Sequence, residues 1–187
     1  MASLGTVREL ISVEDPVPAT MSREQYLRTI FHPDCDFVDG RIEERNVGEQ
    51  GHGKVQKMLL KIFERFESEG GIDAMVETRL QVTPNHFCVP DFMVVVGEDD
   101  NDRYVEKTPL ICIEVLSPED TWKRLREKLS DYLGMGVAHI WAFDPGTRMA
   151  HRFDADGLHP VTEAELTVPG TEIRVNVVEA FSLVRKA

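Results

Sequence analysis

Two short apolar stretches decide the fold: Val89–Val96, VPDFMVVV, and Leu110–Pro118, LICIEVLSP. Each contains a nearly continuous apolar run, which is typical of a central strand covered on both faces. Each also carries one carboxylate, Asp91 before the first run and Glu114 near the end of the second. If the two runs pair as an antiparallel hairpin, the start of the first lies beside the end of the second. The pattern therefore predicts that the two carboxylates are neighbours.

A helix is predicted over residues 119–133, directly after the second run. Ser117 or Asp120 can cap its start, because side-chain oxygens accept hydrogen bonds from the free N–H groups of a first turn. Gly136 follows the segment and favours its termination. The helix therefore returns the chain along the sheet that carries the two acids.

Lys128 lies at the edge of the inward face of this helix. With 3.6 residues per turn, that face is formed by Leu125, Leu129 and Tyr132. The ammonium group of Lys128 can therefore point at the sheet. In a strand, Leu116 points to the same face as Glu114, and a lysine would be expected at this position. Because position 116 is a leucine, Lys128 is predicted to supply the amine from the helix instead.

This combination of groups suits a divalent metal ion and a phosphodiester. Magnesium and manganese prefer oxygen ligands and leave coordination positions for water and phosphate. The predicted ligands are Asp91, Glu114 and the backbone carbonyl of Val115, with Lys128 orienting the attacking water or stabilising charge on the phosphate. The residues therefore indicate a metal-dependent nuclease.

Simpler interpretations of the same residues stay open. Burying an unpaired carboxylate costs several kcal/mol, so Glu114 needs a cation, a proton or a position at the protein's edge. Lys128 could serve only as its structural counter-ion. Asp91 could be a strand-edge residue that hydrogen bonds a turn.

Composition limits the class of protein. The chain has 187 residues, 42% hydrophobic and 29% charged, which is typical of one globular domain. Its three cysteines are widely spaced and indicate neither a disulfide framework nor a structural zinc site. No membrane-spanning run or signal peptide is recognisable, so a cytoplasmic location is expected. The net charge of −12 argues against a broadly basic nucleic-acid-binding surface and leaves room only for a local basic patch.

The other segments frame this central stretch. Residues 1–20 are predicted to form an N-terminal arm and residues 21–187 a single domain. Ser22 is predicted to cap a short helix, and Asp39-Gly40 to form a tight hairpin turn. A long amphipathic helix is expected from Glu49 or His52 to about Ser68. Further strands are predicted at about 75–82, 138–143, 149–153 and 172–177, with residues 181–184 packing on the core.

The motifs match a known family. They are Pro90-Asp91, Glu114–Pro118, Glu127-Lys128-Leu129 with Tyr132, Gly136-Val137 and Trp141–Pro145. Their order resembles the bacterial Uma-two family of proposed restriction endonucleases, within the PD-(D/E)XK nuclease-like superfamily, over residues 36–184. The resemblance implies an α/β fold with a restriction-endonuclease-like core, a mixed central β-sheet flanked by helices, and a magnesium-type ion.

The resemblance also implies roles for individual residues. Asp91 and Glu114 would be metal ligands, and Lys128 would be the catalytic lysine moved from the strand to the helix. His52 falls where the family often has a histidine opening the first helix, so His52 and the preceding Glu49 are auxiliary candidates.

The leading hypothesis is an endonuclease that hydrolyses phosphodiester bonds in DNA through a metal-activated water, with Mg²⁺ or Mn²⁺ as cofactor. A homodimer would suit cleavage of two strands. One alternative is a catalytically inactive nuclease-fold protein that binds nucleic acid or a protein partner. Another is a structural module that self-associates through the N-terminal arm.

Overall fold

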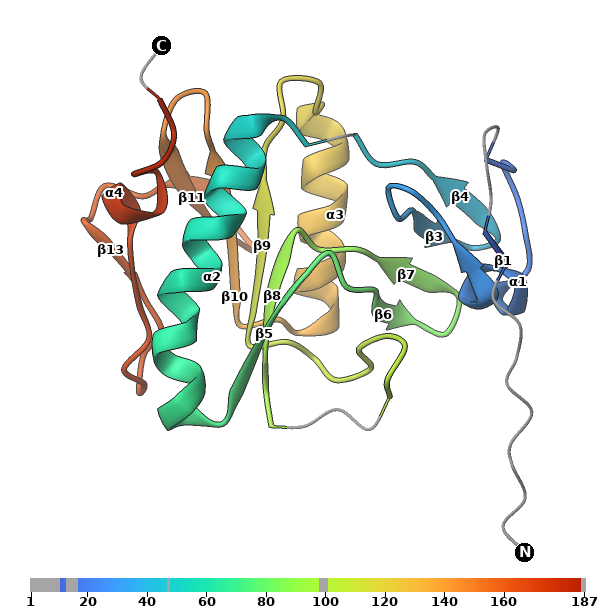
Figure 1. Cartoon of the computed structure of the whole chain (residues 1–187), viewed down its shortest axis with the longest axis horizontal. Coiled ribbons are helices and arrows are strands. Elements are labelled where there is room, and N and C mark those ends of the chain that lie inside the picture. Colours follow the sequence, from blue (N-terminus) through green and yellow to red (C-terminus); the bar gives the residue numbers. More distant parts are fainter. Residues whose placement is uncertain (1–10, 13–16, 47, 98–100, 186–187) are drawn as a thin grey trace, which may run out of the picture.

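A six-stranded mixed sheet forms the centre of the protein (Figure 1). The computed structural model describes residues 11–12, 17–46, 48–97 and 101–185. The strand order is β12-β11-β10-β9-β8-β5. In chain order the strands are β5 (Ile72–Val76), β8 (Phe92–Val96), β9 (Ile111–Val115), β10 (His139–Asp144), β11 (Met149–Asp154) and β12 (Gly157–Pro160). Strands β9 and β10 are parallel and the other neighbours antiparallel, so the predicted mixed sheet is confirmed.

Two helices cover opposite faces of this sheet, α2 (Gln50–Gly70) and α3 (Trp122–Met135) (Figure 1). Side chains of a strand alternate between faces, and successive residues of β8 accordingly belong to different core clusters. Phe92 packs in the cluster that contains the apolar face of α2, and Met93 in the cluster that contains α3. Both faces of β8 are thus covered, as its continuous apolar run predicts.

The hairpin of β8 and β9 has the predicted antiparallel pairing. Phe92 lies opposite Ile113, and Met93 lies opposite Cys112. Continuing this register by one residue brings Asp91 opposite Glu114. Because alternation places both carboxylates on the face covered by α3, the helix that carries Lys128 lies over them.

A four-stranded sheet, ordered β4-β3-β7-β6, lies beside the main sheet (Figure 1). Its strands are β3 (Asp36–Val38), β4 (Arg41–Glu43), β6 (Leu80–Thr83) and β7 (His86–Cys88). Asp39 and Gly40 connect β3 and β4 with φ of 49° and 88°, which is the predicted tight turn. One face packs Phe37 and Phe87 against Tyr26, with ring centroids 5.0 and 5.5 Å from the tyrosine ring.

Two predicted elements differ from the observed ones. The single strand expected over residues 75–82 is divided, because β5 ends at Val76 and β6 begins at Leu80 in the other sheet. Glu77, with φ of 47°, lies at the point where the chain leaves the main sheet. Helix α3 begins at Trp122 with Thr121 as its cap, since the Asp120 carboxylate accepts a hydrogen bond from the Ser117 N–H instead.

The remaining described elements are short. They are β1 (Ile11–Ser12), α1 (Arg23–Arg28), β2 (Thr29–Ile30), β13 (Glu165–Thr167), β14 (Arg174–Asn176) and α4 (Val177–Ala180). Ser22 caps α1 as predicted, and Phe181 belongs to the core cluster under α2. Most of the predicted arm, residues 1–10 and 13–16, lies outside the described residues. Within the described part of the chain, none of the helices combines the length and apolar character needed to span a bilayer.

Candidate active site

Asp91 and Glu114 meet at the end of the β8–β9 hairpin. Both residues are nearly buried, with 4% and 6% of their surfaces exposed. The Asp91 Oδ2 atom accepts a hydrogen bond of 2.7 Å from the backbone N–H of Val115, the residue that follows Glu114. This bond holds the first carboxylate against the strand that carries the second.

Lys128 and Tyr132 reach Glu114 from α3. The Lys128 Nζ atom lies 3.0 Å from Glu114 Oε2, and the Tyr132 hydroxyl donates to Oε1 at 2.6 Å. Lys128 also donates to the Val89 carbonyl at 2.8 Å. Positions 128 and 132 are one turn apart, so adjacent turns of the helix hold both oxygens of one carboxylate. Lys128 therefore lies where the sequence analysis expects it.

Burial controls the protonation of this pair. Removal from water raises the pKa of Glu114 to about 7, with the positive charge of Lys128 opposing the shift and the negative charge of Asp91 adding to it. Burial lowers the pKa of Lys128, but the carboxylates of Asp36 and Glu114 outweigh that effect and raise it above its ordinary value. Lys128 thus stays charged, and Glu114 is the group that titrates near neutral pH.

Asp91 has two cationic or potentially cationic neighbours. The Arg45 guanidinium donates through Nη2 to Asp91 Oδ1, and His52 Nε2 lies 3.6 Å from the same oxygen. The Arg45 side chain is only 10% exposed, and although burial lowers its pKa, the nearby Asp91 and Glu114 carboxylates raise it overall. His52 comes from the first turn of α2, and its Nδ1 lies 3.5 Å from the Ser117 hydroxyl.

Three residues that the sequence analysis did not assign to the site also surround it. Asp36 in β3 accepts a 2.7 Å hydrogen bond from the Val89 N–H, which fixes the segment leading to Asp91. Arg45 lies between β4 and α2, where no periodic sequence pattern indicates which way its side chain points. Tyr132 is part of the predicted inward stripe of α3, but its pattern marks it only as a core residue.

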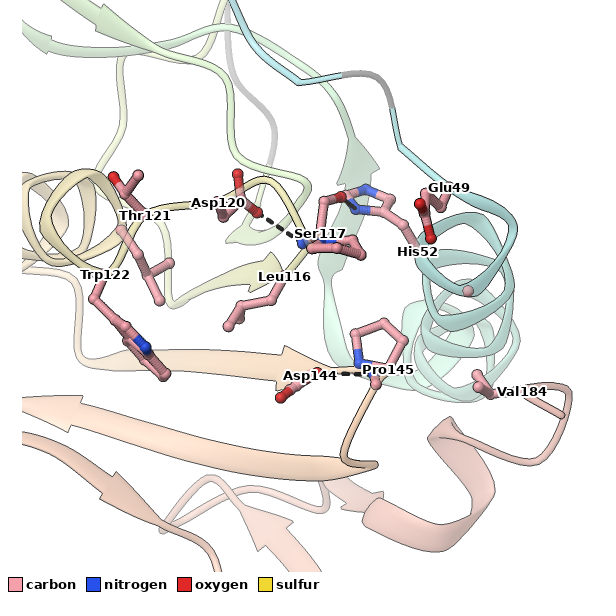
Figure 2. A pocket seen from close by; sticks show the side chains of 14 residues that line it. Glu49, His52, Leu116, Ser117, Asp120, Thr121, Trp122, Asp144, Pro145 and Val184 are labelled. Carbon is pink, nitrogen blue, oxygen red and sulfur yellow. Dashed lines mark hydrogen bonds between the residues drawn. The ribbon is translucent and has the colours of Figure 1, made fainter. Parts of the chain in front are cut away.

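Glu49 lies apart from the acid pair. It precedes α2 as an exposed residue, and its side chain makes no capping hydrogen bond. It lines a neighbouring cavity of about 360 Å³ together with His52, Leu116 and Trp122 (Figure 2). His52 and Leu116 also line the smaller cavity beside the carboxylates, so the two hollows adjoin. Of the two auxiliary candidates, the structure brings only His52 to the acid pair.

The smaller cavity, beside the two carboxylates, has a volume of about 50 Å³. It is lined by Asp91, Glu114 and Val115, with Arg45 and Lys128 among its other residues. Carboxylate and carbonyl oxygens are the ligands that magnesium prefers, and a volume of this size accommodates an ion with a water molecule. The donor set therefore fits such an ion, although Arg45 would compete with it for Asp91 Oδ1.

The fold and the site define a mixed α/β protein with two paired carboxylates at the strand ends. The family model described as "Uma2: Putative restriction endonuclease" matches residues 23–183. The chain therefore belongs to the Uma2 family, a family of nuclease type.

One solved structure supports the fold. A structure described as a putative nuclease belonging to DUF820, from Anabaena variabilis ATCC 29413, superposes with a TM-score of 0.70 at 19% identity, covering 82% of this chain and 93% of that one. The DrdV–DNA complex superposes with a TM-score of only 0.35 at 16% identity, covering 72% of this chain and 13% of that one. Comparison with curated proteins finds no match.

Proposed function

We propose that this protein is an endonuclease that hydrolyses phosphodiester bonds in DNA and depends on Mg²⁺ or Mn²⁺. The observation that carries the proposal is that Asp91, Glu114 and Lys128 converge at one end of the β8–β9 hairpin. The Lys128 Nζ atom lies 3.0 Å from Glu114 Oε2. Membership of the Uma2 family supports nuclease activity of the chain.

Asp91, Glu114 and the carbonyl oxygen of Val115 would hold the metal ion. When bound, the ion would supply Lewis-acid polarisation of the phosphoryl oxygen and lower the pKa of a water molecule. Its charge would also favour the ionised form of Glu114, whose pKa burial raises to about 7. Cofactor binding and the charge state of this carboxylate are thus linked.

Lys128 would act on the phosphate or on the attacking water. Its ammonium is held by two acceptors, Glu114 Oε2 and the Val89 carbonyl, and has a third donor to offer. A fixed positive charge in a partly desolvated site stabilises negative charge that develops on a phosphate without further rearrangement. Tyr132 would keep the Glu114 carboxylate in one orientation.

The ion pair of Arg45 and Asp91 favours a second candidate function. With this guanidinium on Oδ1 and the Val115 N–H on Oδ2, both Asp91 oxygens already have partners. A nuclease-fold protein that binds DNA or a protein partner without cutting it would need no metal at this position. The net charge of −12 also favours a partner other than extended duplex DNA.

A plasmid cleavage assay separates the two functions. The full chain is incubated with supercoiled plasmid and with single-stranded DNA, in Mg²⁺, Mn²⁺ or chelator. Cleavage is expected with either metal and should be lost in Asp91→Asn, Glu114→Gln and Lys128→Met. Lys123→Met is the matched control on the same helix, because its side chain is 86% exposed and faces solvent.

Each outcome has a defined meaning. Cleavage that survives all three site changes would refute the site assignment. DNA binding without cleavage under every metal condition would refute the endonuclease proposal and support the binding protein.

The proposal includes a homodimer, because two copies of one site are needed to cut both strands in a single encounter. Light scattering of the purified chain should give twice the monomer mass at the concentration used for cleavage. A monomeric mass under conditions in which supercoiled plasmid is linearised without a nicked intermediate would refute the dimer.

A further inference from the structure

A second polar interface lies between the four-stranded sheet and α3. Residues 38 and 86 are paired across β3 and β7, and residues 36 and 43 across β3 and β4, so their side chains share one face. The opposite face is apolar and packs on Tyr26. The polar face looks toward one side of α3, and both elements line a hollow of about 40 Å³. The residues contributed by α3 are Arg124, Glu127, Lys128 and Asp131.

Three potential metal ligands converge in this hollow. His86 Nε2 lies 3.4 Å from Cys88 Sγ and 3.4 Å from Asp131 Oδ2, and one ligand atom from each residue lies within 4.8 Å of the others. Tetrahedral zinc with bonds of about 2.0–2.3 Å requires neighbouring ligand atoms about 3.3–3.8 Å apart. The two histidine distances fall inside that range before any ion is bound.

The types of ligand select the metal. Imidazole nitrogen, thiolate sulfur and carboxylate oxygen together form a set that suits zinc and does not suit magnesium or calcium, which bind oxygen. Three protein ligands leave the fourth tetrahedral position for water. The hollow is large enough for that water molecule, and Glu43 and Glu127 at its walls add negative charge.

The two cations that line the hollow have other partners. Lys128 donates to Val89 and Glu114, and Arg124 donates to the Glu44 carbonyl. Arg124 also lies 4.0 Å from Asp36. The positive charges are therefore held by neighbouring oxygens at the edge of the hollow.

We propose that His86, Cys88 and Asp131 bind one zinc ion at a site separate from the Asp91–Glu114 pair. The ion would join β7 to α3. Cys88 directly precedes Val89, whose carbonyl holds Lys128, and Asp131 lies three residues after Lys128 on α3. Zinc at this point would therefore join the two segments that lie beside Lys128.

Binding requires the thiol to lose its proton. Burial raises the pKa of Cys88 well above its ordinary value, with the negative charge of Asp36 adding to the shift, so the metal-free thiol is protonated. Zinc binding to this site must release that proton, because only the thiolate coordinates the metal.

The test uses the full chain after removal of metal by a chelator. Zinc binding is measured by competition with a chromophoric indicator, and cobalt(II) is added separately to record its absorption spectrum. The unmodified chain should bind one equivalent of zinc at this site and show thiolate-to-cobalt charge transfer. Cys88→Ser should abolish the charge-transfer band, and Asp131→Asn should weaken zinc binding at least about tenfold.

Two controls locate the ion. Cys35→Ser changes another buried cysteine and should leave the cobalt spectrum unchanged. Glu114→Gln alters the other candidate site and should leave one equivalent of zinc bound. Because Asp131 is partly exposed, its variant should fold even if substitution of the buried Cys88 does not, and circular dichroism checks both.

The results can overturn the proposal independently of nuclease activity. Zinc affinity unchanged in Asp131→Asn, or cobalt bound by the unmodified chain without a thiolate band, would refute the site. Zinc binding lost in Glu114→Gln but retained in Cys88→Ser would place the ion at the acid pair instead.

Discussion

Replacing Lys128 with methionine should destabilise the protein by an amount that depends on pH. The substitution keeps most of the apolar stem and removes the ammonium that contacts Glu114 and Val89. The two side chains of the ion pair are only 13% and 8% exposed, so solvent screens the lost interaction little. Removing one partner of a buried pair costs about 3–5 kcal/mol when the other stays charged.

The pH dependence follows from the pKa of Glu114. Its ordinary value is 4.5, and burial raises the folded value to about 7 against the opposing charge of Lys128. Between these values the folded state retains a proton that the unfolded state has lost, so stability falls as pH rises. Without Lys128 the folded pKa moves higher, and the loss of stability continues above pH 7.

Urea denaturation at two pH values measures the effect. Near pH 6, where Glu114 is largely protonated in both proteins, Lys128→Met should cost about 1.5 kcal/mol, because the charged hydrogen bond to Val89 and the attraction of the Asp36 carboxylate are lost. Near pH 9 the cost should rise to about 3 kcal/mol or more. The same substitution in a Glu114→Gln background should lose its pH dependence. An equal cost at both pH values in the single variant would refute the reasoning.

Three further outcomes are expected. Calorimetric titration with Mn²⁺ should show metal binding that is lost in Glu114→Gln, and unchanged binding in that variant would exclude Glu114 as a ligand. Arg45→Met should lower the unfolding free energy of the metal-free protein by about 3 kcal/mol, because it removes the guanidinium from the buried Asp91 Oδ1. Excess Mn²⁺ should restore part of this loss, which denaturation with and without metal would measure. Thr121→Ala should cost about 1 kcal/mol in thermal or urea unfolding because it removes the N-cap hydrogen bond of α3 to Arg124, and no measurable change would contradict that role.

The order and pairing of the central elements follow from the sequence alone. Two continuous apolar runs indicate strands buried on both sides, and the apolar stripe of α3 orients the helix. Those periodicities predict that Asp91 and Glu114 are neighbours if the two runs pair, and that Lys128 can point at the sheet. The resemblance to the Uma2 family rests on the same residues, and the family match over residues 23–183 confirms it.

Local patterns were insufficient where the chain passes between sheets. Residues 75–82 alternate like one strand, yet the chain turns at Glu77 and enters a second sheet. Helix α3 begins three residues later than the predicted residue 119 for a similar reason. The Asp120 carboxylate accepts a hydrogen bond from the Ser117 N–H, and Thr121 caps the helix. In both cases contacts outside the local period decide the outcome.

The amino-acid sequence alone thus determined the two central strands, the helix that follows them and the candidate residues Asp91, Glu114 and Lys128 that they carry. Only the tertiary structure decided which other groups surround them. Arg45 reaches Asp91 from an irregular segment, and His86 and Cys88 meet Asp131 across a sheet–helix interface. Periodicity reports the direction of a side chain within its own element, whereas these contacts depend on how separate elements pack together.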